Sequence, residues 1–300
     1  LQIQSNHIQM SYYFMFVILF FVGAYFEDAY KKKELPHFFK ASGVLALAAV
    51  VGVCINISNL YHTYEYSKET MRGKSELKQE GAAASQTSSG LDRDYITNWS
   101  YGIGETLTLL VPNVKGGGSG STMSQSEAAM AKANPMYNGI YSQLPQYFGE
   151  QPWTAGPVYV GAFVMFLFVL GCFIVKGPLK WALLGATIFS ILLSWGKNFM
   201  GLTDFFIDYV PMYNKFRAVS SILVIAEFTI PLLAIFALKE ILSKPDMLKQ
   251  EKNCRGVIAA LVLTAGVALI LAVAPGTFFS SFITAQEMTC LLYTSPSPRD

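Results

Sequence analysis

The sequence predicts an all-α fold: a polytopic bundle of about six transmembrane helices that carries a partly ordered extracytoplasmic insert. Three observations predict it. Of the 300 residues, 52% are hydrophobic and only 14% are charged, whereas soluble domains carry about 25% charged residues. Several apolar runs approach the roughly 20 residues that a helix needs to cross a bilayer. Lysine and arginine are dense in every second connection between these runs and sparse in the others.

Six apolar runs are the candidate spans. Lipid offers no hydrogen-bond partner to a bare peptide group, so a run that crosses the membrane is expected to be helical. The first and fourth runs are short, and we expect them to extend into flanking residues. In chain order the runs are 11–26, 41–60, 158–175, 181–195, 218–238 and 256–275.

The basic residues predict the orientation of the spans, because cytoplasmic connections carry an excess of lysine and arginine. Connections 27–40, 176–180 and 239–255 together hold eleven Lys and Arg in 36 residues. Connections 61–157 and 196–217 hold ten in 119 residues. The first set is therefore predicted to be cytoplasmic and the second extracytoplasmic. The net charge of +2 gives no general attraction to nucleic acid, and no nucleic-acid partner is predicted.

The spans divide the chain into four regions. Two spans precede a long insert, and four more spans precede a short tail; the regions are 1–60, 61–157, 158–289 and 290–300. Within the insert, the small polar residues of 72–93 and GGGSGS at 116–121 predict flexible segments. In contrast, NWSYGIGETLTLLVPN at 98–113 mixes aromatic, glycine and apolar residues, which predicts order.

The two ends of the chain are not expected to be natural termini. The last eleven residues, CLLYTSPSPRD, are expected to be an artefact. The codons TGT CTC TTA TAC ACA TCT, which match a transposon-type sequencing adapter, encode CLLYTS. The chain also begins at Leu1 without a methionine. We therefore expect a fragment that is open at both ends.

The connection between the fourth and fifth spans, SWGKNFMGLTDFFIDYVPMYNKFRAVSS at 194–221, is rich in charge. Apolar residues recur at helical spacing over 199–210, which predicts a short helix lying in the membrane interface. Basic residues on the side that the positive-inside bias disfavours need compensation. A bound phosphate would supply it, because an Arg fork matches phosphate oxygens; ion pairs with the two aspartates or with lipid headgroups would also supply it. The charged residues are Lys197, Asp204, Asp208, Lys215 and Arg217.

Glu227 is a carboxylate near the middle of the apolar run ILVIAEFTIPLLAIFAL. Such a residue costs about 2.5–3.5 kcal/mol on insertion scales and is expected to face the bundle interior with a partner. Two interpretations stay open. Glu227 lines an aqueous cavity or a proton relay, or it makes a buried hydrogen bond to a polar group such as Asn56 or Ser58.

Several blocks of the chain resemble one family, in order and over nearly all of 6–289. They are NHIQMSYY at 6–13, TYEYSKETMRGKSEL at 63–77, WSYGIGETLTLLVPN at 99–113, YFGEQPWTAGPVYVGA at 147–162, and GKNFMG…DFF…VPMYNKFRAVSS from 196 onward. These blocks resemble the YfhO-like bacterial multi-pass membrane proteins in the form seen in Bacteroidetes, which are placed with the GT-C-type membrane glycosyltransferases. The resemblance implies an enzyme of the bacterial inner membrane. Such enzymes take a sugar from a polyprenyl-phosphate carrier and transfer it to a cell-envelope glycan on the extracytoplasmic face.

That chemistry places three demands on the chain. A carboxylate takes the proton of the acceptor hydroxyl, cations stabilise the departing lipid phosphate, and a lipid-facing groove holds the polyprenyl tail. The family's usual carboxylate lies in the first extracytoplasmic loop, which this fragment is expected to lack. The remaining catalytic candidates are Glu105, Asp204 and Asp208, and the substrate-binding candidates are Lys197, Asn198, Lys215, Arg217, His7 and Gln9.

No cofactor is predicted. His37 and His62 have no companions at ligand-like spacing, so no histidine-based metal site is expected, and a divalent ion held by carboxylates stays an open alternative. Two other functions also stay open. A transporter or flippase for a lipid-linked precursor would want polar residues along several spans, where only Asn56, Ser58 and Glu227 stand out. A non-catalytic membrane scaffold would use its insert to bind a partner.

Overall fold

The computed structural model describes residues 3–5, 7–70 and 90–279. The regular elements in these ranges are helices. The β-type pairing in the described residues is an isolated antiparallel bridge between Thr122 and Pro145. The prediction of an all-α fold is therefore confirmed. Most of the predicted flexible segment 72–93 and the whole of the predicted artefact 290–300 lie outside the described residues.

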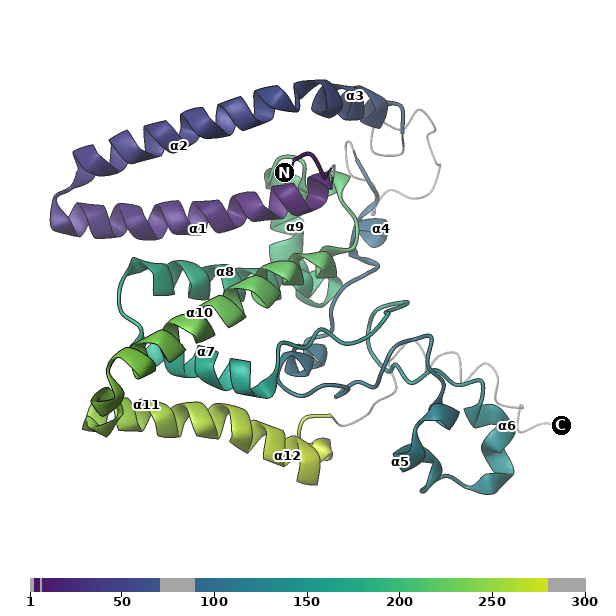
Figure 1. Cartoon of the computed structure of the whole chain (residues 1–300). Coiled ribbons are helices and arrows are strands. Elements are labelled where there is room, and N and C mark those ends of the chain that lie inside the picture. Colours follow the sequence, from purple (N-terminus) through teal and green to yellow (C-terminus); the bar gives the residue numbers. More distant parts are fainter. Residues whose placement is uncertain (1–2, 6, 71–89, 280–300) are drawn as a thin grey trace.

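The long helices form an elongated bundle (Figure 1). Two of them continue through neighbouring turns: α10 follows a 3-10 segment, Val219–Leu223, and α11 runs into α12 through a π-helical turn, Val262–Gly266. The helices are α1 (Ile8–Lys32), α2 (Leu35–Ile55), α3 (Ile57–Lys68), α7 (Ala162–Ile174), α8 (Pro178–Ser194), α9 (Met200–Tyr209), α10 (Val224–Ser243), α11 (Glu251–Leu261) and α12 (Val267–Val273).

Among the described residues, four helical stretches are long and apolar enough to cross a membrane: Ile8–Lys32, Leu35–Ile55, Val219–Ser243 and Glu251–Val273. They indicate a membrane protein. A fifth arises if α8 and α9 count as one span, although the two are bent by 107°. Helix α7 has 13 residues, or about 20 Å, which is less than the roughly 30 Å of a hydrocarbon core. The count of about six spans stays a prediction, because the runs at 158–175 and 181–195 form helices too short to cross alone.

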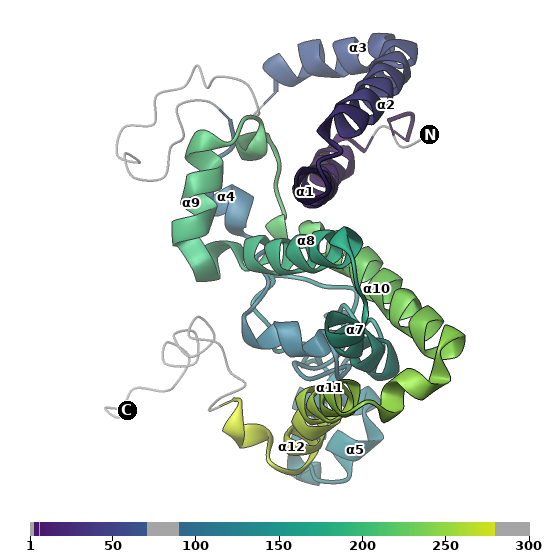
Figure 2. The same ribbon diagram turned by 90° about the vertical axis from the view of Figure 1, so that its left-hand side faces the viewer.

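Helices α8 and α10 lie at the centre of the bundle, with α1 on one side and α7 followed by α11 on the other (Figures 1 and 2). Glycines allow close approach at two of these contacts. A Cβ at Gly171 of α7 would lie 3.1 Å from Leu233 of α10, and one at Gly185 of α8 would lie 2.9 Å from Phe20 of α1. Helix α2 lies outside α1 and has no buried residue.

The connections gather at two opposite ends of the bundle (Figure 1). The α1–α2, α7–α8 and α10–α11 connections lie at one end, and the insert lies with the α9 region at the other, which we call the insert end. This is the alternation that the basic residues predict. Which end faces the cytoplasm stays a prediction.

The first part of the insert is built onto the bundle, as the composition of 98–113 predicts. The Tyr101 N–H donates to the Ser194 carbonyl at the end of α8 at 2.8 Å. The Ser220 N–H, just before α10, donates to the Trp99 carbonyl at 3.1 Å. Tyr101 and Leu109 are buried in the same apolar cluster as side chains of α7, α8 and α10. The order of this segment therefore comes from the bundle beneath it.

The glycine-rich tract at 116–121 is not the flexible linker that its composition predicts. Gly116 adopts a positive φ of 85°, and a Cβ there would lie 1.6 Å from the Gln146 carbonyl oxygen. The Ser119 N–H donates to the Thr154 carbonyl at 2.9 Å. These glycines allow two segments of the insert to approach closely through their backbones, and composition alone does not separate that role from flexibility.

Candidate functional site

Glu105 is the predicted site residue that the structure surrounds most completely. It lies in the 3-10 helix Gly104–Leu109 and is only 2% exposed. Its Oε2 accepts the Gly102 N–H at 2.6 Å and the Glu150 N–H at 3.3 Å, and its Oε1 accepts the hydroxyl of Tyr147. A carboxylate offers about four acceptor positions. Three are used, which leaves one on Oε1.

Glycines bring the backbone close to this carboxylate. A Cβ at Gly149 would lie 2.0 Å from Glu105 Oε1 and 2.2 Å from the Tyr147 hydroxyl oxygen. A Cβ at Gly102 would lie 2.9 Å from Glu105 Oε2. Side chains at these two positions would occupy the space of the carboxylate and its donors. The sequence spacing Gly-x-Gly-Glu shows only part of this arrangement, since Tyr147 and Gly149 come from 42 or more residues further along the chain.

A polar cavity of about 310 Å³ opens beside Glu105. That volume lies at the lower end of the range for small-ligand pockets. Asn198 lies at its wall and donates through its amide to the Tyr101 carbonyl at 3.0 Å. The cavity is lined by Glu105, Glu150, Lys115 and Asn198, by Phe148, Phe278 and Phe279, by Ile103, and by Gly102, Gly104 and Gly149. Carboxylates, an amide, a cation and aromatic rings therefore meet in one space.

The two tyrosines nearest to Glu105 are held neutral. Burial raises the pKa of Tyr147 far above its ordinary value, and the hydrogen bond to Glu105 and the Glu105 charge raise that pKa further. Burial likewise raises the pKa of Tyr101, with smaller upward contributions from the charges of Glu105 and Glu227 against a lowering hydrogen bond from Thr108. Both phenols therefore remain hydrogen-bond donors at physiological pH.

Asp204 and Asp208 are held by a cation that the sequence did not single out. Arg93 of the short helix α4 (Arg93–Thr97) donates through Nη1 to Asp204 and through Nη2 to Asp208 at 2.6 Å. The two aspartates lie four residues apart on α9 and present their carboxylates together. The ion pairs expected with Lys197, Lys215 or Arg217 are therefore not the ones that form. Both aspartates serve as anchors for the insert.

Removing this anchor is expected to destabilise the protein moderately. Arg93→Ala leaves two like charges one turn apart, and we expect a loss of about 1 kcal/mol in the free energy of unfolding, because half-exposed ion pairs contribute about 0.2–1 kcal/mol each. The check is a double-mutant cycle of Arg93→Ala with Asp204→Ala in lipid nanodiscs. Arg255→Ala is the control, because its partner Glu251 lies on the same helix and both side chains are highly exposed. A loss no larger than that of the control would refute the anchor.

The substrate-binding candidates at the start of α1 lie close to Arg217. The Gln9 amide donates to the Arg217 carbonyl at 2.7 Å, and His7 caps α1 by accepting the Met10 N–H at 3.4 Å. The Arg217 guanidinium donates to the Tyr95 hydroxyl at 2.7 Å. It also lies 5.7 and 5.9 Å from the ring centres of Tyr95 and Trp99. These are cation–π distances.

Partial burial lowers the pKa of Lys215, the other cation of this segment. The backbone here is strained at two non-glycine residues, Met212 and Ala218, whose φ values are 67° and 58°. Lys215 and Arg217 lie between these two residues in the sequence. Backbone strain of this kind is concentrated at functional sites, which supports a functional role for the segment.

Lys197 belongs to a different neighbourhood from Arg217. Its ammonium donates to the Glu150 carbonyl at 3.3 Å and lies 3.6 Å from the Glu150 carboxylate. Its N–H donates to the Ser100 hydroxyl at 2.9 Å. The cavities of about 310 and 440 Å³ and the small chamber beside Tyr147 are lined by none of Lys197, Lys215 and Arg217. Lys197 and Arg217, both expected to bind the lipid phosphate, therefore share none of these cavities, and the chain at Trp99–Ser100 contacts both residues.

Glu227 lies on an exposed face of α10 and not in the bundle interior. Within the described ranges no hydrogen bond or ion pair involves it. The amide of Asn56 donates to the Gly52 carbonyl of its own helix at 2.9 Å, and Ser58 is exposed on α3. The predicted buried hydrogen bond to either residue is therefore wrong, because α2 and α3 lie outside α1 and away from α10. The charge of Glu227 nevertheless acts on Tyr101.

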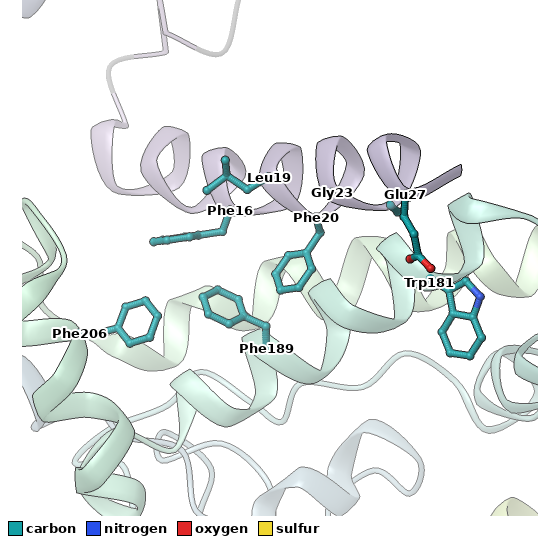
Figure 3. A pocket seen from close by; sticks show the side chains of 9 residues that line it. Phe16, Leu19, Phe20, Gly23, Glu27, Trp181, Phe189 and Phe206 are labelled. Atoms are coloured by element: carbon teal, nitrogen blue, oxygen red, sulfur yellow. The ribbon is translucent and has the colours of Figure 1, made fainter. Parts of the chain in front are cut away.

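An apolar groove of about 440 Å³ runs along α1, α8 and α9 (Figure 3). Figure 3 shows the rings of Phe16, Phe189 and Phe206 turned toward this space. A lipid-facing groove is expected from the family resemblance, but its location could not be predicted, because its walls come from helices far apart in the chain. The groove is lined by Phe16, Leu19, Phe20, Gly23, Ala24, Glu27, Trp181, Phe189 and Phe206.

A series of aromatic contacts leads from the groove toward the basic segment at 215–217. The ring centres of Phe16 and Phe189 lie 5.2 Å apart, those of Tyr12 and Phe16 5.2 Å, and those of Tyr12 and Phe216 5.1 Å. Phe216 stands between Lys215 and Arg217 in the sequence. The groove and the two cations are thus connected along α1.

Comparison with protein-family models, with curated proteins and with solved structures finds no match. In the part of the chain that the structure describes, no three His, Cys, Asp or Glu side chains are placed to hold a metal ion. The fold and the site define the chain as an all-helical membrane protein. A buried carboxylate faces a polar cavity at its insert end.

Proposed function

We propose that the chain belongs to an integral membrane glycosyltransferase-like enzyme that uses a polyprenyl-phosphate-linked sugar to modify a cell-envelope glycan or polymer. The observation that carries the proposal is the placement of Glu105, a buried carboxylate with one acceptor position left beside a polar cavity of about 310 Å³. The resemblance of the sequence blocks to YfhO-like proteins supports the same chemistry. The site lies at the insert end, where the connections are poor in lysine and arginine.

Glu105 acts as the general base. Its Oε1 accepts the proton of an acceptor hydroxyl while the hydroxyl oxygen bonds to the anomeric carbon of the donor sugar. The bond between that carbon and the phosphate oxygen breaks, and its electron pair leaves with the lipid phosphate. Asn198, Lys115 and the aromatic rings of the cavity supply hydrogen bonds and stacking surface for the sugar. Asp204 and Asp208 take no part, because Arg93 holds both.

The lipid part of the donor lies along α1. The groove offers an apolar, aromatic wall for the polyprenyl chain, and the series of rings through Tyr12 and Phe216 leads to the cations. Arg217 and Lys215 bind the phosphate of the donor lipid as it arrives along the groove, because an Arg fork and a partly desolvated ammonium suit phosphate oxygens. Neither residue lines the polar cavity, so Lys115, the cation of that cavity, stands beside the phosphate when it departs near Glu105. Partial burial lowers the pKa of Lys215, and the negative charge of the donor phosphodiester would raise that pKa again.

The proposal includes a topology, which the alternation of basic residues supports. The insert and the α9 region lie on the extracytoplasmic side of a bacterial inner membrane, and the lysine-rich connections lie in the cytoplasm. Helix α7 and the bent α8–α9 pair complete the six membrane segments as partial spans, with the 98–113 segment covering their outer ends. Irregular backbone is tolerated at this depth where it is buried in protein or lines a cavity.

The enzyme fits better than the two alternatives. A flippase needs a polar path for the headgroup, whereas the groove is apolar along nearly all of its length. A scaffold needs no buried carboxylate, and burying one without a use is costly. The proposal therefore rests on Glu105 and not on the groove alone.

Replacing Glu105 by glutamine is the direct test. In cells that make the protein, Glu105→Gln is expected to lower sugar transfer to the envelope glycan by about a hundredfold or more, because general bases contribute about 10²–10⁴. The readout is the sugar composition of the purified glycan, measured at equal amounts of membrane-inserted protein. Glu127→Gln is the control, since Glu127 is an exposed carboxylate of the same insert. Unchanged transfer in Glu105→Gln would reject the proposal.

A further inference from the structure

Tyr147 contributes the only side-chain donor to Glu105 among the described residues. Its hydroxyl donates to Oε1 and accepts the Gln151 N–H at 3.0 Å, which fixes the direction of the phenol. Gly149 leaves room for this contact, because a Cβ there would lie 2.2 Å from the hydroxyl oxygen. Tyr147 is thus oriented by the backbone on one side and by the carboxylate on the other.

The space behind Tyr147 admits no ligand. An enclosed chamber of about 10 Å³ lies there, with Tyr101, Thr108 and Thr154 in its wall. A chamber of this size is at the lower limit for one water molecule. A ligand therefore reaches Glu105 from the polar cavity and not from the chamber.

Among the described residues, the other charged and titratable groups around Glu105 donate no side-chain hydrogen bond to its carboxylate. Glu150 contributes its backbone N–H to Oε2, and its carboxylate is paired with Lys197. Lys115 directs its ammonium over the Phe279 ring, 4.5 Å from the ring centre. The groups that face Glu105 directly or act through a neighbour are Tyr101, Lys115, Tyr147, Glu150, Lys197 and Glu227.

We propose that Tyr147 is the positioning residue of the Glu105 carboxylate. Its hydroxyl holds Oε1 in place and leaves the last acceptor position of Oε1 for the ligand in the polar cavity. This inference rests on the proposed function, because a general base must be held in a fixed direction toward the hydroxyl whose proton it accepts.

The test measures the hydrogen bonding of the Glu105 carboxylate directly. Infrared difference spectra between the protein in nanodiscs and its Glu105→Gln variant isolate the stretching bands of this carboxylate. In Tyr147→Phe these bands are expected to shift in frequency, because Oε1 loses its side-chain hydrogen-bond donor. Tyr141→Phe is the control, since Tyr141 lies in α6 (Asn138–Tyr141) outside the cavity.

A second variant keeps the shape of the site in case Tyr147→Phe does not fold. Trifluorotyrosine at position 147 retains the ring and the hydroxyl but is a stronger donor, so the carboxylate bands are expected to shift in the direction opposite to that in Tyr147→Phe. Bands in both variants that match those of Tyr141→Phe would overturn the inference. If Glu105→Gln abolishes sugar transfer while the bands do not shift, the proposed function stands and the role of Tyr147 falls. If the bands shift while Glu105→Gln retains transfer, the role of Tyr147 stands and the proposed function falls.

Discussion

Gly196→Ala is expected to destabilise the fold by about 3 kcal/mol or more. Gly196 turns the chain from α8 toward α9 with a φ of 43°, a conformation that costs other residues roughly 1–2 kcal/mol. A Cβ there would also lie 2.1 Å from the Ser100 hydroxyl oxygen and 2.6 Å from a methyl carbon of Val219. Neither neighbour can move away freely, because Ser100 bonds to Thr97 and Lys197 and Val219 is buried. Overpacking of this kind adds about 1–3 kcal/mol.

The measurement is the midpoint of thermal unfolding in nanodiscs. Gly201→Ala is the matched control: it is five residues further along, in α9, and a Cβ there meets nothing within 4 Å. We expect the control to be neutral or to gain up to about 1 kcal/mol from reduced freedom of the unfolded chain. The double variant Gly196→Ala with Ser100→Gly should recover part of the loss. Equal stability of Gly196→Ala and Gly201→Ala would show that the turn tolerates a side chain.

The sequence predicts the helices of this chain better than their contacts. The long apolar runs become α1, α2, α10 and α11–α12 because a run of about 20 apolar residues has one stable form in lipid. The α2 run is predicted to continue to residue 60, but the helix ends at Ile55. Asn56 accounts for the difference, because its amide bonds back to the Gly52 carbonyl and a new helix begins after it.

Pairings between distant segments are what the sequence leaves open. Arg93 and Asp204 are 111 residues apart, and nothing near either residue indicates that they meet. The turn at 196–198 could be predicted from its residues, Gly-Lys-Asn, whereas the hydrogen bond from the Lys197 N–H to Ser100 could not. The aromatic groove has the same origin, since Phe16 and Phe189 are ordinary core residues until α1 lies on α8. Glu105 could be selected because glycines flank it, whereas Tyr147 and Gly149 carry no such signal.

Gly149→Ala is expected to leave the fold intact and to inactivate the site. Its Cβ would lie 2.0 Å from Glu105 Oε1 and 2.2 Å from the Tyr147 hydroxyl oxygen, which are the far ends of two flexible side chains. The Glu105 carboxylate can rotate away without moving the backbone, whereas the Tyr147 ring, whose Cζ would lie 2.3 Å from the new Cβ, must tilt and give up its contact with Oε1. The displaced carboxylate would then no longer accept a proton in the polar cavity. We expect about a hundredfold loss of sugar transfer, close to that of Glu105→Gln, because the same general base is lost.

The two glycine substitutions separate the stability of the fold from the geometry of the site. In Gly149→Ala the unfolding midpoint should stay near that of the wild type, and the infrared bands of Glu105 should shift as they do when the Tyr147 hydroxyl is removed. Gly156→Ala is the control, since a Cβ there meets nothing within 4 Å although Gly156 lies in the wall of the small chamber. If Gly149→Ala unfolds early, the insert depends on Gly149 for its backbone path. If it transfers sugar normally, the contact between Glu105 and Tyr147 is not part of the active geometry.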